Sequence, residues 1–392
     1  MMTSKSIYPT LFFLFLGYSA IAQSWFKGNL HTHSLWSDGD DFPEMILQWY
    51  KDHGYQFVAL SDHNSVAEGE FWYEIKEREV RNRTLEKYLD KFGDWVEVRR
   101  EANSTYVRLK TYEEYKAKME IPESFTIIRS EEVTSQFEKK PVHINVSNIQ
   151  EKIEPIKGSS VLDIMQQTIN KVREQREQFN IPMFAHINHP NFGYGVNVED
   201  MKNLNGERFF EVYNGHPAVH NEGDAFHMDT ETMWDLINIH YHKKGQPLLL
   251  GIATDDSHHY HESSSDLSNT GRGWVMVQSE DLSANNLIEA MEEGQFYASS
   301  GVILNQLIES NEGISLEIQG EEGAEYEISF MSYRKGNSEV VTAKTVKGQR
   351  ASYQFEPGDI FVRAKITSTA LIENPYQVGE TKKAWTQPIL VQ

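Results

Sequence analysis

Histidine and acidic residues follow apolar segments in the first part of this chain. All fifteen His lie between His31 and His261. His31 and His33 lie two positions apart after the apolar lead-in of a β-strand, so both imidazoles project to one side of it. The apolar run 57–60 is likewise followed by polar residues, S-D-H-N. Polar side chains at the end of a strand usually serve a site, and paired imidazoles can hold a metal ion.

Further along the chain the same arrangement recurs. The residues at such positions that carry suitable donor atoms are His31, His33, Asp38, His63, Glu132, His143, His189, Asp256 and His258. Imidazole and carboxylate together suit zinc, iron or manganese, whereas calcium and magnesium favour oxygen alone. These donors exceed the needs of one ion. The spacing therefore predicts a hydrolase site with two or three divalent metals, in which a metal-bound hydroxide attacks phosphorus or a carbonyl.

Composition restricts the class of protein. The chain has 392 residues, 39% of them hydrophobic, which is enough for a large core and two domains. Lys and Arg number 37 against 58 acids, so the net charge of −21 argues against nucleic acid or an anionic membrane as a partner. There is no Cys, so disulfides, Cys ligands and a Cys nucleophile are excluded. No G-x-S-x-G sequence indicates a Ser nucleophile.

The amino terminus has the pattern of a signal peptide. Lys5 precedes the apolar run 11–16, and Ala20-Ile21-Ala22 offers the small residues that a signal peptidase needs. We expect residues 1–22 to be removed and the protein to be exported, to a periplasm or to the medium. The alternative, a membrane anchor, is disfavoured because the run is shorter than the roughly 20 residues that span a bilayer.

Strand-like and helix-like segments alternate over residues 23–300. Helices are predicted from Pro43 to Gly54, Ser160 to Asn180, Thr230 to Gly245 and Ser283 to Gly294. Seven apolar runs end in polar residues, which favours a β/α barrel with a site at its carboxyl-terminal mouth. The alternative is an open doubly wound sheet, for which no Gly-rich phosphate loop is present.

Two segments depart from this alternation. Residues 66–124 form a charged insertion that we expect to be helical, either as a solvated helix or as a roof over the site. Residues 301–392 show period-two runs separated by turn residues, which predicts a small all-β, sandwich-like domain.

The motifs together resemble those of the PHP (polymerase and histidinol phosphatase) family of metal-dependent phosphoesterases. The matching sequences, between Asn29 and His258, are H-T-H followed by S-D-G, then S-D-H-N, E-E-V-T, P-V-H, I-N-H-P and D-D-S-H. The segment 271–301, G-R-G-W-V-M-V to G-Q-F-Y-A-S-S-G, further resembles the CehA/McbA branch, which includes carbaryl-type ester hydrolases.

This resemblance implies a distorted seven-stranded β/α barrel and a division of the donors among up to three metals. Glu132 and Asp256 would act in catalysis through the metals and their bridging hydroxide. The implied groups are His31, His33, Glu132 and Asp256 for the first metal, Glu132, His143 and His189 for the second, and Asp38, His63 and His258 for the third.

Three neighbours compete with these assignments. They are Glu131 for Glu132, Asp255 for Asp256 and His186 for His189. In the family, a small polar residue stands two positions after the bridging Glu, as Thr134 does here, the acidic ligand stands two before a His, and the last His precedes Pro.

Other polar residues have less specific expectations. Asp62 is expected to orient a liganding His. Arg272 is a candidate for binding a substrate anion, and its alternative role is structural, between barrel and sandwich. Asn214 is a second candidate substrate contact, although Asn214 and Glu211 are also explained as ordinary rim residues. His259 and His261 are expected to be exposed.

The sequence therefore predicts an exported metal-dependent hydrolase, most simply a phosphoesterase, acting on a small or glycan-linked ester. Hydrolysis of a carboxyl ester, carbamate or lactone on the same metals is the alternative within enzymes. A glycan-binding surface protein with an inactive barrel is the alternative of another class. Substrate and oligomeric state are left open.

Overall fold

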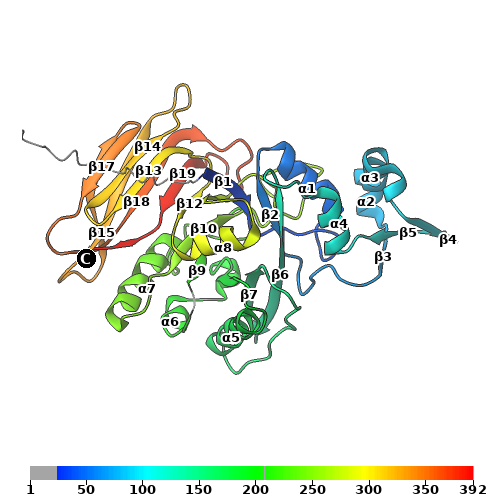
Figure 1. Ribbon diagram of the computed structural model, residues 1–392, viewed down its shortest axis with the longest axis horizontal. Helices are drawn as coiled ribbons and strands as arrows, with labels where there is room; N and C mark the ends of the chain where they lie inside the picture. The colour runs from blue at the N-terminus through cyan, green and yellow to red at the C-terminus, as the bar shows by residue number, and fades with distance from the viewer. Residues whose placement is uncertain (1–23, 207, 392) are drawn as a thin grey trace, which may run out of the picture.

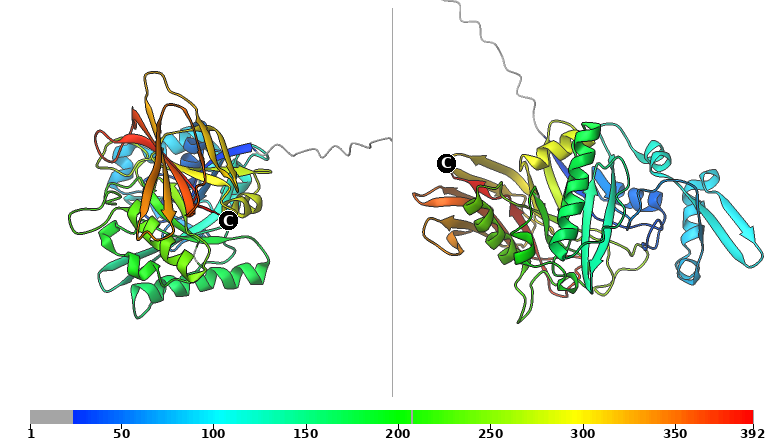
Figure 2. Two further views of the ribbon diagram at one scale, coloured as in Figure 1. Left: turned by 90° about the vertical axis from the view of Figure 1, so that its left-hand side faces the viewer. Right: turned by 90° about the horizontal axis from the view of Figure 1, so that it is seen from below.

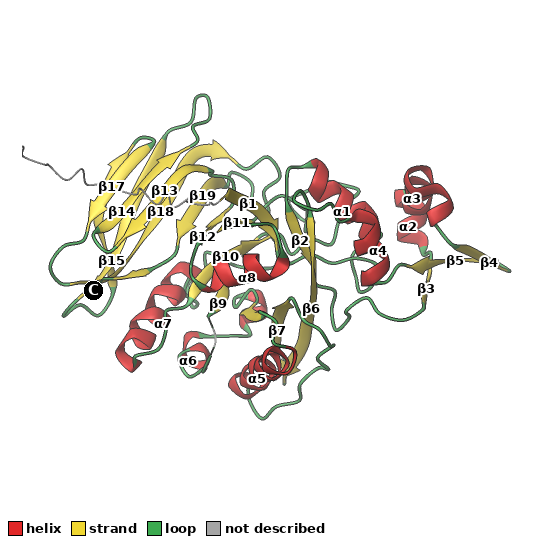
Figure 3. Cartoon of the chain, viewed as in Figure 1, coloured by secondary structure: helices red, strands yellow, loops and turns green. Residues whose placement is uncertain are grey.

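The computed structural model describes residues 24–206 and 208–391 as a mixed α/β structure (Figure 1). Most of its strands belong to one large mixed sheet, and two three-stranded sheets flank it (Figure 3). The signal peptide predicted for residues 1–22 lies outside the described residues. Among the described helices, none has both the length and the apolar character needed to cross a bilayer.

The strands of the amino-terminal part are consecutive neighbours in the large sheet, in the order β10-β9-β8-β7-β6-β2-β1. Their bounds are β1 (Ser24–Asn29), β2 (Phe57–Leu60), β6 (Thr126–Phe137), β7 (Lys140–Ser147), β8 (Phe184–Ile187), β9 (Phe209–Asn214) and β10 (Leu250–Thr254). Strand β7 runs antiparallel to both of its neighbours. The prediction that every run ends at one rim is therefore wrong for β7, whose beginning lies at that rim.

The first and last of these seven strands meet just beyond their carboxyl ends. Asp256 donates its backbone N–H to the carbonyl of His31 at 3.0 Å, and His33 donates to Ser257 at 2.9 Å. On its other side β1 pairs with β11 (Trp274–Ser279), which pairs with β12 (Phe296–Ser299). The strand pairing thus gives a continuous mixed sheet whose edges touch at one rim, and a closed seven-stranded barrel stays a prediction.

The helices predicted from capping residues are present. They are α1 (Pro43–Asp52), α5 (Val161–Phe179), α7 (Thr230–Lys244) and α8 (Ala284–Glu292), with a short α6 (Val198–Met201) between strands. The hydroxyls of Ser160 and Ser283 accept backbone N–H groups in the first turns of α5 and α8. Gly245 ends α7 in the left-handed conformation. Buried apolar faces of α5 and α7 pack on the large sheet.

The insertion is not the simple helix that its charges suggested. It contains β3 (Phe71–Glu74), α2 (Glu77–Asn82), α3 (Thr84–Phe92), β4 (Val98–Glu101), β5 (Ser104–Leu109) and α4 (Tyr112–Met119), with a three-stranded sheet β3-β5-β4. Figure 2 shows this sheet projecting from the rest of the molecule. The guanidinium of Arg99 lies over the rings of Trp72 and Tyr106, so charged residues of this sheet pack on aromatic ones.

One part of the insertion is anchored to the segment that follows β1. The Phe42 and Tyr88 rings stack at 4.0 Å, and Leu35 joins the same buried apolar cluster. The indole N–H of Trp95 donates to Glu44 at 2.8 Å. The helical side of the insertion is therefore held against residues 35–44, beside the predicted metal ligands.

The segment after residue 300 is all-β, as predicted. One sheet consists of β13 (Leu304–Ser310), β14 (Gly313–Ile318) and β17 (Arg350–Gln354). The other strands are β15 (Tyr326–Arg334), β16 (Val340–Lys347), β18 (Asp359–Leu371), β19 (Thr381–Thr386) and β20 (Ile389–Leu390). Buried side chains of both sheets, such as Leu316 and Phe330, share one core. Because β19 pairs with β12, the second sheet is continuous with the amino-terminal sheet.

Candidate metal centre

His31 and His33 follow β1 and are completely buried. The Nε2 atoms of both rings have no hydrogen-bond partner. His31 Nε2 lies 3.2 Å, and His33 Nε2 3.3 Å, from the same oxygen of Asp256. The two imidazoles therefore present lone pairs to a shared carboxylate.

Glu132 lies at the centre of this group, in the middle of the long strand β6. Its carboxylate is fully buried, and Oε2 has no hydrogen-bond partner. The nearest ring nitrogens lie at 3.4 Å in His31, 3.2 Å in His33, 2.8 Å in His63, 3.0 Å in His143 and 3.5 Å in His189. This carboxylate is the group on which the predicted first and second metal sites converge.

Asp256 reaches the cluster through an unusual backbone conformation. Its φ of 50° lies in the left-handed region, which non-glycine residues seldom adopt and which is found often at functional sites. The hydrogen bond from its backbone N–H to the carbonyl of His31 holds this turn. Its side chain, 5% exposed, consequently faces inward with both ends of the sheet around it.

The third predicted group lies closer to solvent. Asp38 Oδ1 lies 3.4 Å from His258 Nε2, and Asp38 Oδ2 lies 3.6 Å from His63 Nε2. The Asp38 side chain is 56% exposed, in contrast to the buried Glu132. Together with His33, these donors form one of the overlapping groups whose ligand atoms lie within 4.8 Å of one another. The structure thus brings all nine predicted ligands into one cluster.

Hydrogen bonds fix the orientation of the rings. His258 donates from Nδ1 to the backbone carbonyl of Asp256 at 3.0 Å, which leaves Nε2 facing Asp38. His63 Nδ1 lies 2.5 Å from the hydroxyl of Thr134. Such contacts to the second ring nitrogen are typical of metal-binding His residues.

Glu211 is the main positioning residue, and its role was not resolved from sequence. Its carboxylate accepts from His31 Nδ1 at 2.7 Å and from the backbone N–H of His189 at 2.7 Å. Thr254 and Asn214 each donate a further hydrogen bond at 2.8 Å. Glu211 therefore fixes the tautomer of one ligand and the backbone of another.

Asp62 does not orient a His side chain, as had been expected. Its carboxylate accepts hydrogen bonds from the backbone N–H and hydroxyl of Ser34 and from the hydroxyl of Ser37, each at 2.7 Å. It acts instead on the turn between His33 and Asp38.

Of the three competing neighbours, Glu131 and Asp255 face away from the metal cluster, whereas His186 borders it. Glu131 accepts from the backbone N–H of Ile153, on the opposite side of β6. Asp255 accepts from the backbone N–H groups of Gly271, Arg272 and Gly273. His186 Nε2 lies 3.4 Å from Glu211, and with His31 these two residues form a further group whose ligand atoms lie within 4.8 Å of one another.

Neither predicted substrate contact is in a position to bind substrate. Arg272 is completely buried, and its guanidinium donates to the carbonyls of Asn374, Gly215 and Ser264. Its role is structural, because these carbonyls occupy its N–H groups. Asn214 is also buried and donates to Glu211 and to Asp256 at 3.1 Å, so it positions carboxylates.

A cavity of about 320 Å³ opens onto the cluster and introduces three residues that sequence reasoning missed. These are Arg78 from helix α2, Phe192 and His216. Arg78 belongs to the insertion, for which both a solvated helix and a roof over the site were left open, and its place at the cavity agrees with the second interpretation. Phe192 and His216 stand alone in segments without a motif. The sequence around His216, N-G-H-P-A, contains no metal-binding or catalytic motif, so it did not indicate that this side chain lines the site.

The carboxylates of the cluster are held ionised. Against burial, they raise the pKa of His31, and they also raise that of His63 to about 9, so a metal ion would displace protons from these two rings. Burial raises the pKa of Glu132, but the neighbouring charges of His63 and His31 outweigh it and hold the pKa well below its usual range. The pKa of Asp256 is likewise held low, against burial, by His31. Burial lowers the pKa of His33 to about 3, with His258 and His63 adding to the effect. Ionised carboxylates and a neutral imidazole are the forms that bind metal.

These residues fit divalent metal ions. Unpartnered donor atoms of His31, His33, Glu132 and His143 are buried within a single cluster, and leaving buried polar atoms unpaired is costly unless a ligand satisfies them. Mixed imidazole and carboxylate donors suit zinc, manganese or iron.

Comparisons with known proteins give limited information. No protein-family model matches this chain. No curated protein matches it. One similar solved structure is a two-domain protein from Bacteroides vulgatus ATCC 8482, described as containing a predicted PHP-like metal-dependent phosphoesterase. The two chains are 13% identical, the match covers 93% of this chain and 96% of that chain, and the TM-score is 0.42. Another is an amidohydrolase from Chromobacterium violaceum with bound sulfate and no metal, at 17% identity over 39% of this chain and 36% of that one, with a TM-score of 0.17. Both scores are too low to establish a shared fold, so the family and its CehA/McbA branch stay predictions.

Proposed function

We propose that this protein is a metal-dependent hydrolase of ester bonds, most simply a phosphoesterase of the PHP type. The observation that supports it best is the buried Glu132 carboxylate surrounded by five imidazole side chains within 3.5 Å. A structural role for such a cluster would require its nitrogens to be paired, and several are not.

The donors form overlapping groups at and beside the Glu132 carboxylate. Among them are His31, His33 and Asp256, then His31, Glu132 and His189, then His63, Glu132 and His143, and finally His33, Asp38, His63 and His258. Two or three divalent ions held there would polarise an ester and activate water at neutral pH.

The residues around the cavity would orient the ester. Arg78 donates from Nε to Glu79 at 2.7 Å, and its two terminal nitrogens donate to the carbonyls of Gly39 at 2.8 Å and Asp38 at 3.4 Å. A guanidinium has five N–H groups, so Arg78 keeps others for an anionic substrate. Nδ1 of His216 accepts a hydrogen bond from the backbone N–H of Ala218, so the neutral ring carries its hydrogen on Nε2. The His216 side chain lines the cavity. Its Nε2–H group would donate to an ester oxygen.

Hydrolysis of a carboxyl ester, carbamate or lactone remains the alternative for the same site, because the donors act equally on a carbonyl. Arg78 at the cavity favours the phosphoester, since it adds a cation where an anion would lie. A binding protein with an inactive barrel is less well supported, because the donor set is complete. Export and a small or glycan-linked substrate are further parts of this proposal and rest on the sequence.

The decisive experiment combines metal analysis with an ester panel. Protein purified without chelator should contain zinc, manganese or iron, and should hydrolyse p-nitrophenyl phosphate or bis-p-nitrophenyl phosphate faster than p-nitrophenyl acetate. Faster turnover of the acetate would favour the carboxyl ester alternative. Protein that binds no divalent metal and turns over none of these esters would contradict the proposal.

A further inference from the structure

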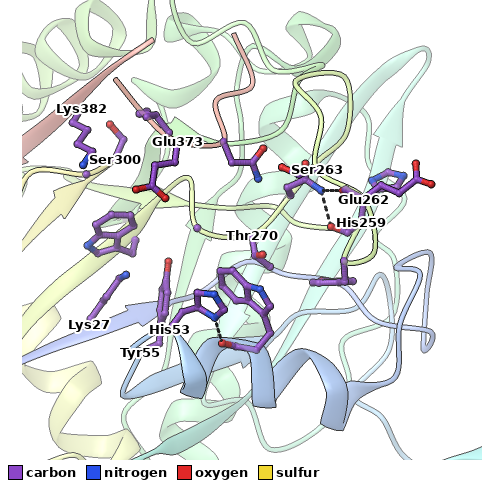
Figure 4. A pocket seen from close by; sticks show the side chains of 18 of the residues that line it. Lys27, His53, Tyr55, His259, Glu262, Ser263, Thr270, Ser300, Glu373 and Lys382 are labelled. Carbon is purple, nitrogen blue, oxygen red and sulfur yellow. Dashed lines mark hydrogen bonds between the residues drawn. The ribbon is translucent and has the colours of Figure 1, made fainter. Parts of the chain in front are cut away.

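A second cavity, of about 460 Å³, lies between helix α1, the segment 259–271 and the loop 372–374 (Figure 4). It is larger than the cavity over the metal cluster, and His259 borders both. Its size is within the range of about 300–1,000 Å³ that is typical of small-molecule sites. No ligand of the metal cluster lines it, so it needs a separate explanation.

Flat rings form much of its wall. Trp49 and His53 of the α1 region stack on each other with centroids 3.8 Å apart and planes 13° apart. The ring of Tyr55 lies beside both Trp49 and Trp274, with centroids 6.3 Å apart in each case, and Lys27 lines the same wall. Aromatic faces of this kind offer apolar contact area at little cost in conformational entropy.

Lys27 is an ammonium group without an acidic partner. Its Nζ lies 3.9 Å from the centroid of Tyr55 and 4.0 Å from that of Trp274. Among the described residues, no carboxylate lies within the 4.0 Å of an ion pair with it, and no hydrogen bond from Nζ is present. Burial lowers the pKa of Lys27 to about 8, against the attraction of Asp255. Its N–H groups are therefore available for an acceptor in the cavity.

Glu373 brings the opposite charge to the same space. Figure 4 shows the side chains of Lys27, Tyr55 and Glu373 around one opening. No ion pair within the described residues involves Glu373, whereas the neighbouring Lys382 is paired with Glu321 at 2.7 Å. The cavity thus offers a strong donor, a strong acceptor and aromatic faces at once.

We propose that this cavity binds a saccharide. A sugar ring has one face of C–H groups, which suits Trp49, and hydroxyl groups that both accept from Lys27 and donate to Glu373. A simple anion would be repelled by Glu373, and an apolar ligand would leave the ammonium of Lys27 without an acceptor. The inference concerns binding alone and does not depend on the proposed hydrolase activity.

The test is a binding assay on the full chain with a defined panel. Saturation-transfer NMR and calorimetry would use glucose, galactose, xylose, N-acetylglucosamine, maltose and cellobiose, with benzoate and citrate as anions that are not sugars. We expect at least one saccharide to bind with a Kd below about 10 mM. Binding of none of the saccharides, or of the two anions alone, would overturn the proposal.

Variants of residues in the cavity test whether the sugar binds there. Lys27→Met and Glu373→Gln should each weaken saccharide binding at least about tenfold. The matched control is Lys118→Met, which removes a cation 5.2 Å from the ring of Trp95, outside the cavity. Equal affinity in all three variants would contradict the site. His31→Ala should leave the affinity unchanged, and this result separates saccharide binding from the metal centre.

Discussion

His31 Nδ1 lies 2.7 Å from Glu211 Oε1, and this contact directs His31 Nε2 toward Glu132 and Asp256. The same carboxylate accepts from the backbone N–H of His189. Glu211 thus connects a ligand that follows β1 with one that follows β8, although they are 158 positions apart in the sequence. The geometry of the cluster therefore depends on this residue.

We expect Glu211→Gln to lower the metal affinity by about 10–100-fold, because an amide no longer fixes the tautomer of His31 by its charge. Competition with a chromogenic chelator measures the affinity directly. The control is Glu199→Gln, at a side chain that is 79% exposed on helix α6. Unchanged affinity in the Glu211 variant would show that the carboxylate is only a packing partner.

The adjacent residues Glu131 and Glu132 provide a second test, because they face opposite sides of β6. Glu132→Gln should reduce bound metal and abolish turnover, since it removes the ionised carboxylate at the centre of the cluster. Glu131→Gln should do neither, because its side chain accepts from Ile153 outside the cluster. Metal content by mass spectrometry and turnover of one ester are sufficient. Full activity in the Glu132 variant would refute the bridging role.

Glu131 should also give a pH-dependent contribution to stability. Burial raises its pKa from 4.5 to about 8, so the folded protein keeps a proton that the unfolded chain loses between these values. The stabilisation that protonated Glu131 adds to the free energy of unfolding is complete below its unfolded pKa of 4.5. It is lost, by about 1.4 kcal/mol per pH unit, as the pH rises from there through the folded pKa of about 8. Gln cannot lose a proton at this position. The Tm of the wild type should therefore fall relative to that of Glu131→Gln between about pH 5 and pH 8, and parallel Tm curves would contradict this.

Much of the site could be predicted because its residues stand in short motifs. The pair His31 and His33, and the sequences around His63 and Asp256, show recognisable spacing next to apolar runs. The choices of Glu132 over Glu131 and of Asp256 over Asp255 agree with where these side chains lie. The direction of the strands was less predictable. Period-two patterns do not give strand direction, so the antiparallel β7 that carries His143 was not foreseen.

The failures concern side chains whose role depends on tertiary contacts. Arg272 is next to a motif, yet it binds loop carbonyls as far away as Asn374. Arg78 belongs to a charged helix with no motif, and only the packing of the insertion on residues 35–44 brings it to the cavity. Sequence spacing contains no information on such long-range contacts.

Arg78 provides the test that distinguishes the two ester classes. We expect Arg78→Met to lower kcat/KM for p-nitrophenyl phosphate by about 10–100-fold, chiefly through KM, because a hydrogen bond to a charged group contributes about 1.5–3 kcal/mol. Turnover of the neutral p-nitrophenyl acetate should change little. Arg78→Lys should give an intermediate effect, since a point charge remains but the planar fork is lost.

Controls separate this role from a structural one, because Arg78 also donates to the carbonyl of Gly39, beside Asp38. Arg81→Met changes an exposed Arg on the same helix and should leave both esters unaffected. Metal content measured in parallel shows whether the turn at Asp38 is intact. An equal loss on both esters together with loss of metal would mean that Arg78 supports the ligand turn, whereas a loss confined to the phosphate ester with full metal content assigns it to the substrate anion.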